Sequence, residues 1–229
     1  MTISIASPNG TNREITLSPE MEKHFSIPIN HSNTILNQIN GGMYEKWFKG
    51  RKNLTCYDFG GNIGLVALYM LPACKKLIVV EPTPSHYNLM AELINKNMEA
   101  GQIILFSPNA LTEKNEDVVF ATGHATENKV SSIDGYGAHK ITVKGQTLSS
   151  FIGENIVDFC KIDIEGYEIF ALTEEQLKSV YGKVKTFFVE CHPSNNYGMD
   201  DCREELIKRF INCGYSVDVE DYQTIIATI

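Results

Sequence analysis

Apolar and polar positions along the chain alternate between short continuous runs and runs with helical spacing. The run Leu54–Asp58 is typical of a buried strand, and Ile63–Leu71 of a helix that ends at Pro72, because proline cannot continue a helix. The same alternation recurs further along the chain, which predicts a parallel sheet with right-handed crossovers. The expected strands are Leu54–Asp58, Lys76–Glu81, Ile103–Phe106, Ile156–Asp163, Val184–Glu190, Tyr215–Val219 and Thr224–Thr228.

Two parts of the chain depart from this alternation. Residues 1–50 begin with polar sequence and then place Ile35, Leu36 and Ile39 at helical spacing, so we expect an N-terminal helical segment that packs on the core. Residues 112–150 are polar and contain several glycines, and we expect a hairpin or loop insertion there. The remainder, residues 51–229, is expected to form a single domain.

Composition limits the classes of partner and compartment. The 229 residues are 43% apolar and 21% charged, as in ordinary soluble domains. A net charge of −8 without a Lys/Arg cluster disfavours nucleic acid as a partner. Because no apolar run approaches a membrane helix and Met1–Gly10 shows no secretory signal, we expect a cytoplasmic protein without a membrane partner. The six cysteines form no Cys-x-x-Cys pair, which favours buried thiols over zinc sites or disulfides.

Four of the expected strands end in a carboxylate, and these residues are Asp58, Glu81, Asp163 and Glu190. Ligands of open parallel sheets bind beyond the carboxyl ends of the strands. A carboxylate elsewhere on a buried strand would be costly to desolvate. The pattern therefore predicts a binding site at these strand ends.

The segment Asp58–Gly64, with the sequence Asp-Phe-Gly-Gly-Asn-Ile-Gly, joins the first strand to its helix. Its glycines allow a sharp turn and leave room for a ligand against the backbone. The spacing differs from Gly-x-Gly-x-x-Gly, which disfavours a dinucleotide. An acid beside the turn instead favours a positively charged ligand such as S-adenosylmethionine, and Glu81 could accept hydrogen bonds from both ribose hydroxyls.

Several motifs occur together along the chain: Asp58–Gly64, Val80-Glu81-Pro82, Asn109-Ala110-Leu111, Lys161–Glu168 (Lys-Ile-Asp-Ile-Glu-Gly-Tyr-Glu) and Glu190-Cys191-His192. Over roughly residues 40–192 they resemble the FkbM-family methyltransferases, and Lys161–Glu168 is the most specific. The resemblance implies a Rossmann-like class I methyltransferase fold of the α/β class, with a mostly parallel seven-stranded sheet, an antiparallel C-terminal strand and helices on both faces. It also implies a domain over residues 51–229 that binds S-adenosylmethionine and releases S-adenosylhomocysteine.

The resemblance further implies the roles of individual residues. The Asp58–Gly64 turn would cradle the methionine part of the cofactor, and Glu81 would hold its ribose. Asn109 and Ala110 would lie against the adenine, whereas Asp163 and Glu165 would face the amino-acid end or the acceptor. Gly-Gly-Met-Tyr-Glu at positions 41–45 is similar to the Gly-Glu-Tyr-Glu segment of the family. The implied cofactor-binding residues are Tyr44, Glu45, Asp58, Gly60, Asn62, Gly64, Glu81, Asn109, Ala110 and Asp163.

The chemistry expected of such a site is O-methylation of a hydroxyl on a small molecule, natural product or sugar. A neutral hydroxyl is a poor nucleophile and needs a base or a metal. His192 is the first candidate base because its unperturbed pKa lies near neutrality. Alternatively, oxygen ligands from Asp163, Glu165 and Glu190 could bind Mg²⁺ and lower the pKa of the bound hydroxyl. The candidate catalytic residues are thus His192, Asp163, Glu165 and Glu190.

Two other functions stay open at this point. A nicotinamide-dependent oxidoreductase could use a similar sheet, but the glycine spacing and the lack of a Tyr-x-x-x-Lys pair count against it. A non-catalytic methyltransferase-like binding protein would keep the cofactor site without turnover. The sequence identifies neither the acceptor nor the oligomeric state, because this architecture hosts many chemistries.

Overall fold

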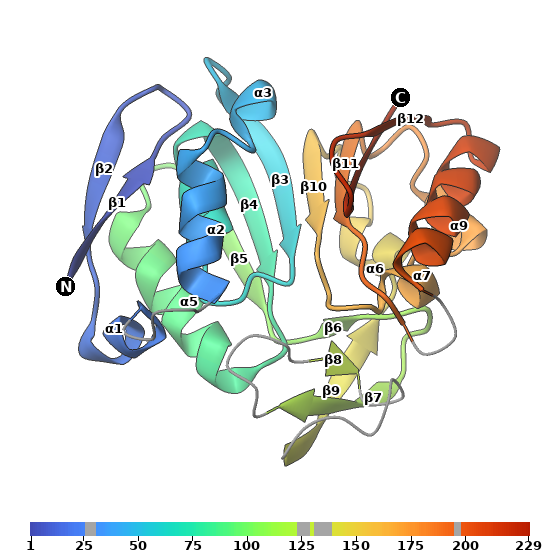
Figure 1. The fold of residues 1–229 in the computed structure, drawn as a ribbon, viewed down its shortest axis with the longest axis horizontal. Helices are drawn as coiled ribbons and strands as arrows, with labels where there is room; N and C mark the ends of the chain where they lie inside the picture. The colour runs from blue at the N-terminus through green and yellow to red at the C-terminus, as the bar shows by residue number, and fades with distance from the viewer. Residues whose placement is uncertain (26–30, 123–128, 131–138, 195–197) are drawn as a thin grey trace. The chain divides into compact units, whose positions relative to one another are not determined.

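The computed structural model describes residues 1–25, 31–122, 129–130, 139–194 and 198–229 (Figure 1). Within them the chain forms two compact units, residues 1–107 and residues 108–229. The expectation of an N-terminal segment over residues 1–50 and a single domain over residues 51–229 stays a prediction. Each unit contains parallel strands and helices of its own.

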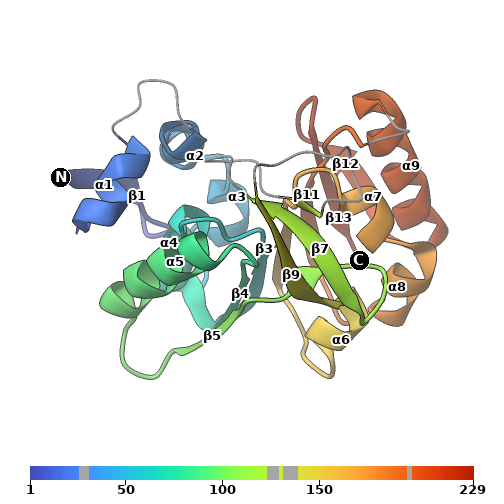
Figure 2. The same ribbon diagram turned by 90° about the horizontal axis from the view of Figure 1, so that it is seen from below.

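Three parallel strands lie at the centre of the first unit: β3 (Leu54–Phe59), β4 (Cys74–Val80) and β5 (Ile103–Ser107). They coincide with the first three predicted strands to within two residues at each end. In Figure 2 the connecting helices lie between these strands and the N-terminal elements, which explains why the first of these helices is buried at every position. The connections are α4 (Leu65–Met70), the short 3₁₀ helix η1 (Leu71–Ala73) and α5 (Pro84–Asn97).

The N-terminal segment begins with a hairpin that the sequence analysis did not predict. Strands β1 (Thr2–Ala6) and β2 (Asn12–Thr16) pair in antiparallel register, and their isoleucines point inward. The alternation of polar and apolar residues in Thr2–Ala6 was the available signal, but it extends over a single short strand. The predicted helical character of residues 1–50 holds further along, in α1 (Pro19–Phe25), α2 (His31–Asn40) and α3 (Glu45–Phe48).

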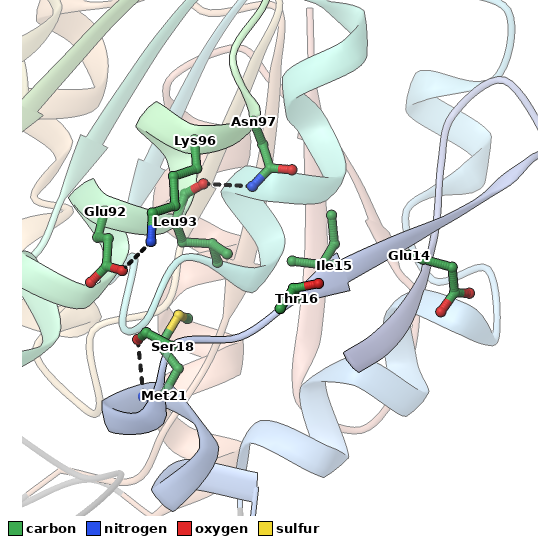
Figure 3. Close-up of a pocket in the computed structure, with 9 residues that line it drawn as sticks. All are labelled: Glu14, Ile15, Thr16, Ser18, Met21, Glu92, Leu93, Lys96 and Asn97. Carbon is green, nitrogen blue, oxygen red and sulfur yellow. Dashed lines mark hydrogen bonds and ion pairs between the residues drawn. The ribbon is translucent and has the colours of Figure 1, made fainter. Parts of the chain in front are cut away.

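A cavity of about 240 Å³ lies between β2, the start of α1 and α5 (Figure 3). Its polar groups are partly engaged with one another, because Lys96 forms an ion pair with Glu92 at 2.5 Å and the Asn97 amide donates to the Leu93 carbonyl. None of the predicted site residues lines this cavity. The lining residues are Glu14, Ile15, Thr16, Ser18, Met21, Glu92, Leu93, Lys96 and Asn97.

The second unit is built on β10 (Phe159–Ile162) and β11 (Thr186–Glu190), which pair in parallel. Strand β13 (Thr224–Thr228) runs antiparallel to β11, and β12 (Ser216–Val219) runs antiparallel to β13. The predicted antiparallel C-terminal strand is therefore present. Three helices complete this part of the unit: α7 (Glu168–Ala171), α8 (Glu174–Ser179) and α9 (Met199–Asn212).

The predicted insertion at 112–150 contains a hairpin. Strands β7 (Asp117–Thr122) and β9 (His139–Gln146) pair in antiparallel register over six positions. Residues 123–128 and 131–138 of the insertion lie outside the described residues. The remaining elements of this region are β6 (Ala110–Leu111), β8 (Lys129–Val130) and α6 (Leu148–Ile152).

The predicted fold class, α/β with a mostly parallel seven-stranded sheet and helices, is confirmed. Three of the seven strands belong to the first unit and four to the second. All six cysteines are buried and outside disulfides, as expected of small apolar side chains. Within the described ranges, none of the helices has the length and apolar character needed to cross a bilayer.

Burial of His86 at the start of α5 generates a prediction about stability. Burial, with a contribution from His24 at a ring-centroid distance of 5.6 Å, lowers the pKa of His86 to about 4. The unfolded chain binds this proton near pH 6.5, so the folded state should lose stability as the pH falls from 6.5 to 4, by about 3 kcal/mol from this group. We expect His86→Gln to remove that part of the pH dependence in urea unfolding curves.

The matched control for this measurement is His139→Gln, which replaces an exposed histidine on β9. Unfolding free energies of the three proteins are compared at pH 6.5 and pH 4. An identical pH dependence in wild type and His86→Gln would contradict the assignment.

Candidate functional site

Two of the predicted carboxylates end neighbouring strands of the first unit. Asp58 is the next-to-last residue of β3, and Glu81 directly follows β4. The parallel register pairs Asp58 with Val79, so both acids lie at the same edge of the strands. Both side chains are buried. The two acids interact electrostatically: after burial, the negative charge of Asp58 also raises the pKa of the Glu81 carboxyl.

The turn after β3 depends on backbone conformations that favour glycine. Gly60 and Gly64 have φ values of +80° and +91°, in the left-handed region. Gly61 is needed for space, since a Cβ there would lie 2.4 Å from Val79 Cγ1. The amides of Gly60 and Gly61 both donate to the Val80 carbonyl at 3.0 Å. The glycines thus hold the turn tightly against β4.

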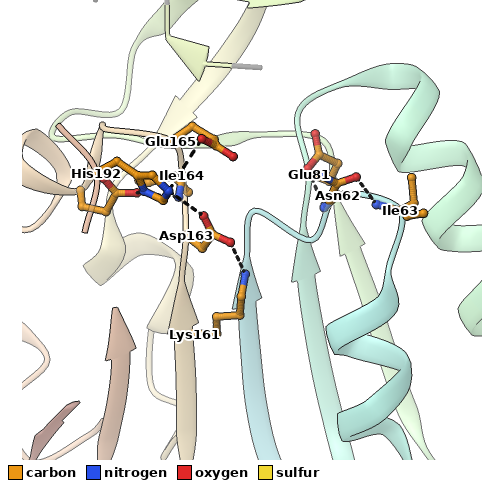
Figure 4. Close-up of polar contacts among 9 residues, drawn as sticks. Asn62, Ile63, Glu81, Lys161, Asp163, Ile164, Glu165 and His192 are labelled. Carbon is orange, nitrogen blue, oxygen red and sulfur yellow. Dashed lines mark hydrogen bonds and ion pairs between the residues drawn. The ribbon is translucent and has the colours of Figure 1, made fainter. Parts of the chain in front are cut away.

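Asn62 and Glu81 connect this turn to the end of β4 (Figure 4). The backbone amide of Asn62 donates to Glu81 Oε2 at 2.8 Å, and the amide of Thr83 donates to Oε1 at 2.8 Å. The side-chain oxygen of Asn62 accepts from the amide of Ile63 at 2.7 Å. Asn62 has a φ of +48°, so its side chain supports an unusual backbone conformation.

The environment of Glu81 fits a hydroxyl-bearing ligand. Burial raises the pKa of its carboxyl, and interactions with the Thr83 side chain and with the backbone amides of Thr83 and Asn62 act in the opposite direction. A carboxylate offers about four acceptor positions, and these two amides use about half of them. The remaining capacity suits the two hydroxyls of a ribose, which supports the role that the family resemblance implied for Glu81.

Tyr44 and Glu45 lie in the N-terminal segment of the first unit. Tyr44 is buried, and its ring lies 5.9 Å from that of Tyr69 on α4. Glu45 begins α3 and forms an ion pair with Lys49 at 2.5 Å. The described contacts of these two residues thus fix α3 and its packing on α4.

In the second unit, Asp163 follows β10 and Glu190 is the last residue of β11. Ile162 pairs with Val189, which places the two acids at neighbouring strand ends. Burial, together with the negative charge of Asp163, raises the pKa of Glu190 to about 7. Lys161 is buried on β10, and its ammonium lies 3.1 Å from Asp163 Oδ2.

The loop that follows Asp163 is organised by the fully buried carboxylate of Glu168. Its Oε1 accepts from the Ile164 amide at 2.7 Å, and its Oε2 accepts from the Gly166 amide at 2.9 Å. Gly166 has a φ of +97°, and a Cβ there would lie 2.8 Å from the carbonyl oxygen of Pro193. These contacts explain why the motif has glycine at position 166 and glutamate at position 168.

His192 packs against this loop (Figure 4). Its Nδ1 lies 3.2 Å from Glu168 Oε1, and its Nε2 lies 3.9 Å from Asp163 Oδ1 and 3.8 Å from Glu165 Oε2. Burial alone would lower the pKa of His192, but the surrounding carboxylates, Glu168 foremost, outweigh it and raise the pKa to about 10. The sequence favoured His192 as a base because of its unperturbed pKa. Because the carboxylates keep the ring protonated at neutral pH, His192 does not fit the role of general base that the sequence analysis gave it.

Asn109 and Ala110 occupy the start of the small sheet in the second unit. The side-chain nitrogen Nδ2 of Asn109 donates to Gln146 Oε1 at 2.9 Å. Ala110 is buried in β6 and pairs with Gly145 of β9. Gln146 thus fixes the side chain of Asn109, a role for which the sequence offered no signal. Lys161 and Glu168 are the first and last residues of the Lys161–Glu168 motif, but the sequence indicated no function for either.

The described residues therefore form two groups. One consists of Asp58, the glycine turn, Asn62 and Glu81 in the first unit. The other consists of Asp163, Glu165, Glu168, Glu190 and His192 in the second unit, which we call the acid–histidine cluster.

Comparison with known proteins relates this arrangement to solved structures. The chain is similar to the methyltransferase FkbM from Methylobacillus flagellatus KT, with 13% identity and a TM-score of 0.52 over 77% of this chain. The match covers 44% of that protein, so the chain spans less than half its length. A comparison with curated proteins by sequence gives no match.

Two further structures share the fold over nearly their whole length. Precorrin-6y C5,15-methyltransferase from Geobacter metallireducens GS-15 has 10% identity and a TM-score of 0.50, covering 93% of this chain and 98% of that one. The N-methyltransferase NodS from Bradyrhizobium japonicum WM9, solved with S-adenosyl-L-homocysteine, has 8% identity and a TM-score of 0.50, covering 90% and 94%. The sequence model of the methyltransferase FkbM domain matches residues 58–217, which is more than half of the chain. The chain therefore belongs to the methyltransferase FkbM domain family.

Proposed function

We propose that the protein transfers a methyl group from S-adenosylmethionine to a hydroxyl of a small molecule, natural product or sugar. The observation that carries this proposal is the buried Glu81 carboxylate, which lies against the glycine turn of an FkbM domain and keeps acceptor capacity for a ribose. Family membership supports methyl transfer as the reaction class. The choice of oxygen as the methylated atom rests on the resemblance alone.

The first unit supplies the cofactor site in this proposal. Buried acids beside the turn favour a ligand with an ammonium and a sulfonium and oppose a pyrophosphate, which counts against the nicotinamide alternative. Glu81 would accept from the ribose hydroxyls, and the turn would lie along the methionine part. The residues of this unit assigned to the cofactor are Tyr44, Glu45, Asp58, Gly60, Asn62, Gly64 and Glu81. The roles that the family resemblance implied for Asn109, Ala110 and Asp163, which belong to the second unit, stay predictions.

The acid–histidine cluster would serve the acceptor. The sulfonium of the cofactor activates the methyl carbon, so the protein has to position the hydroxyl in line and accept its proton. The carbon–sulfur bond breaks with its electron pair going to sulfur, a carbon–oxygen bond forms, and the hydroxyl proton passes to the cluster. His192, Asp163, Glu165 and Glu190 are the residues assigned to this step.

The role of Glu81 is tested by Glu81→Gln. The substitution removes the negative charge but keeps the shape, so we expect the loss of charge-assisted hydrogen bonds to the ribose. Such bonds contribute about 1.5–3 kcal/mol, which corresponds to roughly a 10–100-fold weaker affinity for S-adenosylhomocysteine. The measurement is calorimetric titration, with circular dichroism and thermal melting to verify folding.

Glu92→Gln is the matched control, because Glu92 is an acid of the same unit on α5 that pairs with Lys96. Its affinity should equal that of wild type. A folded Glu81→Gln protein with unchanged affinity would refute the assignment of Glu81 to the ribose.

The role of the cluster is tested by His192→Gln. We expect affinity for S-adenosylhomocysteine within twofold of wild type and about a 100-fold loss of methyl transfer. The ring of His192 faces Asp163 and Glu165, the acids left to accept the hydroxyl proton, and displacement of a catalytic group by about 1 Å can cost about 10²-fold in rate. The assay follows labelled methyl groups into a panel of hydroxylated sugars and aromatic alcohols. Wild-type turnover in His192→Gln would exclude His192 from the reaction, whereas cofactor binding without turnover by wild type would favour the binding-protein alternative.

A further inference from the structure

Three potential ligand atoms of the acid–histidine cluster face one another. Among the described histidines, cysteines and acids, one ligand atom each from Asp163, Glu165 and His192 lies within 4.8 Å of the other two. Nε2 of His192 lies 3.9 Å from Asp163 Oδ1 and 3.8 Å from Glu165 Oε2. Two ligands at about 2.1 Å from a common cation lie at most about 4.2 Å apart, so these separations suit coordination. Figure 4 shows the three side chains pointing toward one another.

The orientation of His192 resembles that of a metal ligand. Its Nδ1 faces the carboxylate of Glu168, which is fully buried and held by two backbone amides. A carboxylate at one ring nitrogen fixes the tautomer and turns the other nitrogen toward a metal, an arrangement common around metal-binding histidines. Here the other nitrogen, Nε2, is the atom that faces Asp163 and Glu165.

Asp163 is also oriented by its neighbours. The buried ammonium of Lys161 lies 3.1 Å from Oδ2, which leaves Oδ1 as the oxygen on the His192 side. Side-chain exposures of 16% for Asp163, 18% for Glu165 and 16% for His192 leave the group partly open to solvent. Water or an acceptor could therefore complete a coordination sphere. The acid–histidine cluster contains four carboxylates, and the positive groups beside them are the Lys161 ammonium and the His192 imidazole. A bound cation would therefore compensate the excess negative charge.

We propose that Asp163, Glu165 and His192 form a binding site for a divalent first-row transition cation such as Mn²⁺. From the sequence, Mg²⁺ held by Asp163, Glu165 and Glu190 was an alternative to a histidine base. The geometry instead groups His192 with the first two acids, and imidazole nitrogen is a ligand of transition metals more than of Mg²⁺. Glu168 is a positioning residue in this arrangement, since it acts through His192.

The consequence for catalysis rests on the proposed function. A divalent cation at this position would act as a Lewis acid on the acceptor hydroxyl and lower its pKa. The cation would displace the proton of His192 Nε2, as metal binding to imidazole requires, and Nε2 would then hold the cation. Removal of the acceptor proton would fall to the neighbouring acids. Cation binding itself requires neither the cofactor nor the acceptor, so it can be tested separately.

The experiment titrates the full chain with Mn²⁺ alone, followed by calorimetry and by the electron paramagnetic resonance signal of free Mn²⁺. We expect one site per chain and at least tenfold weaker binding of Mg²⁺. Asp163→Asn and His192→Gln should each lose at least tenfold in Mn²⁺ affinity. Glu175→Gln and His139→Gln, exposed residues outside the cluster, are the matched controls and should bind as wild type does.

A second measurement separates this inference from the proposed function. Wild type and His192→Gln are titrated with S-adenosylhomocysteine. Circular dichroism and thermal melting verify that every variant is folded, because Asp163 is itself assigned to the cofactor. Mn²⁺ binding that is absent in wild type, or unchanged in both cluster variants, would overturn the metal site while leaving the cofactor site intact. Site-specific Mn²⁺ binding without binding of S-adenosylhomocysteine would support the metal site and overturn the proposed function.

Discussion

Burial of carboxylates at or shortly after the carboxyl ends of parallel strands is the constraint around which both units are built. A buried carboxylate is costly unless donors or positive charge compensate it. In the first unit, backbone amides of Asn62 and Thr83 converge on Glu81, which requires the tight turn that the glycines allow. In the second unit, the amides of Ile164 and Gly166 converge on Glu168. In both places the backbone is folded so that its amide groups donate hydrogen bonds to a buried carboxylate.

The two acids hold their surroundings in different ways. Glu81 fixes a turn that lies against β4, and a side chain at Gly61 would collide with that strand. Glu168 holds the loop after Asp163 through two backbone amides. It also contacts the ring of His192, which lies two residues after the end of β11. The first arrangement offers hydrogen-bond acceptors to a ligand. The second orients an imidazole toward two further carboxylates.

Sequence patterns predicted the strands well, because apolar runs and glycine turns are local signals. Strands β3, β4 and β11 lie within two residues of expectation, and their terminal acids lie at the strand ends. Register and side-chain partners could not be predicted, since they depend on residues distant in sequence. The contact of Glu168 with His192 spans 24 positions, and it reverses the expected charge state of the histidine. The N-terminal hairpin was missed because one short alternating strand is a weak signal.

The central claim is that the glycine turn and Glu81 form a site for an adenosyl ligand with positive charge and without a pyrophosphate. The most direct test is calorimetric titration of the wild-type protein with S-adenosylmethionine, S-adenosylhomocysteine and NAD⁺ under identical conditions. The account predicts micromolar binding of both adenosyl ligands and no binding of NAD⁺ at the same concentrations. Binding of NAD⁺ alone would contradict it.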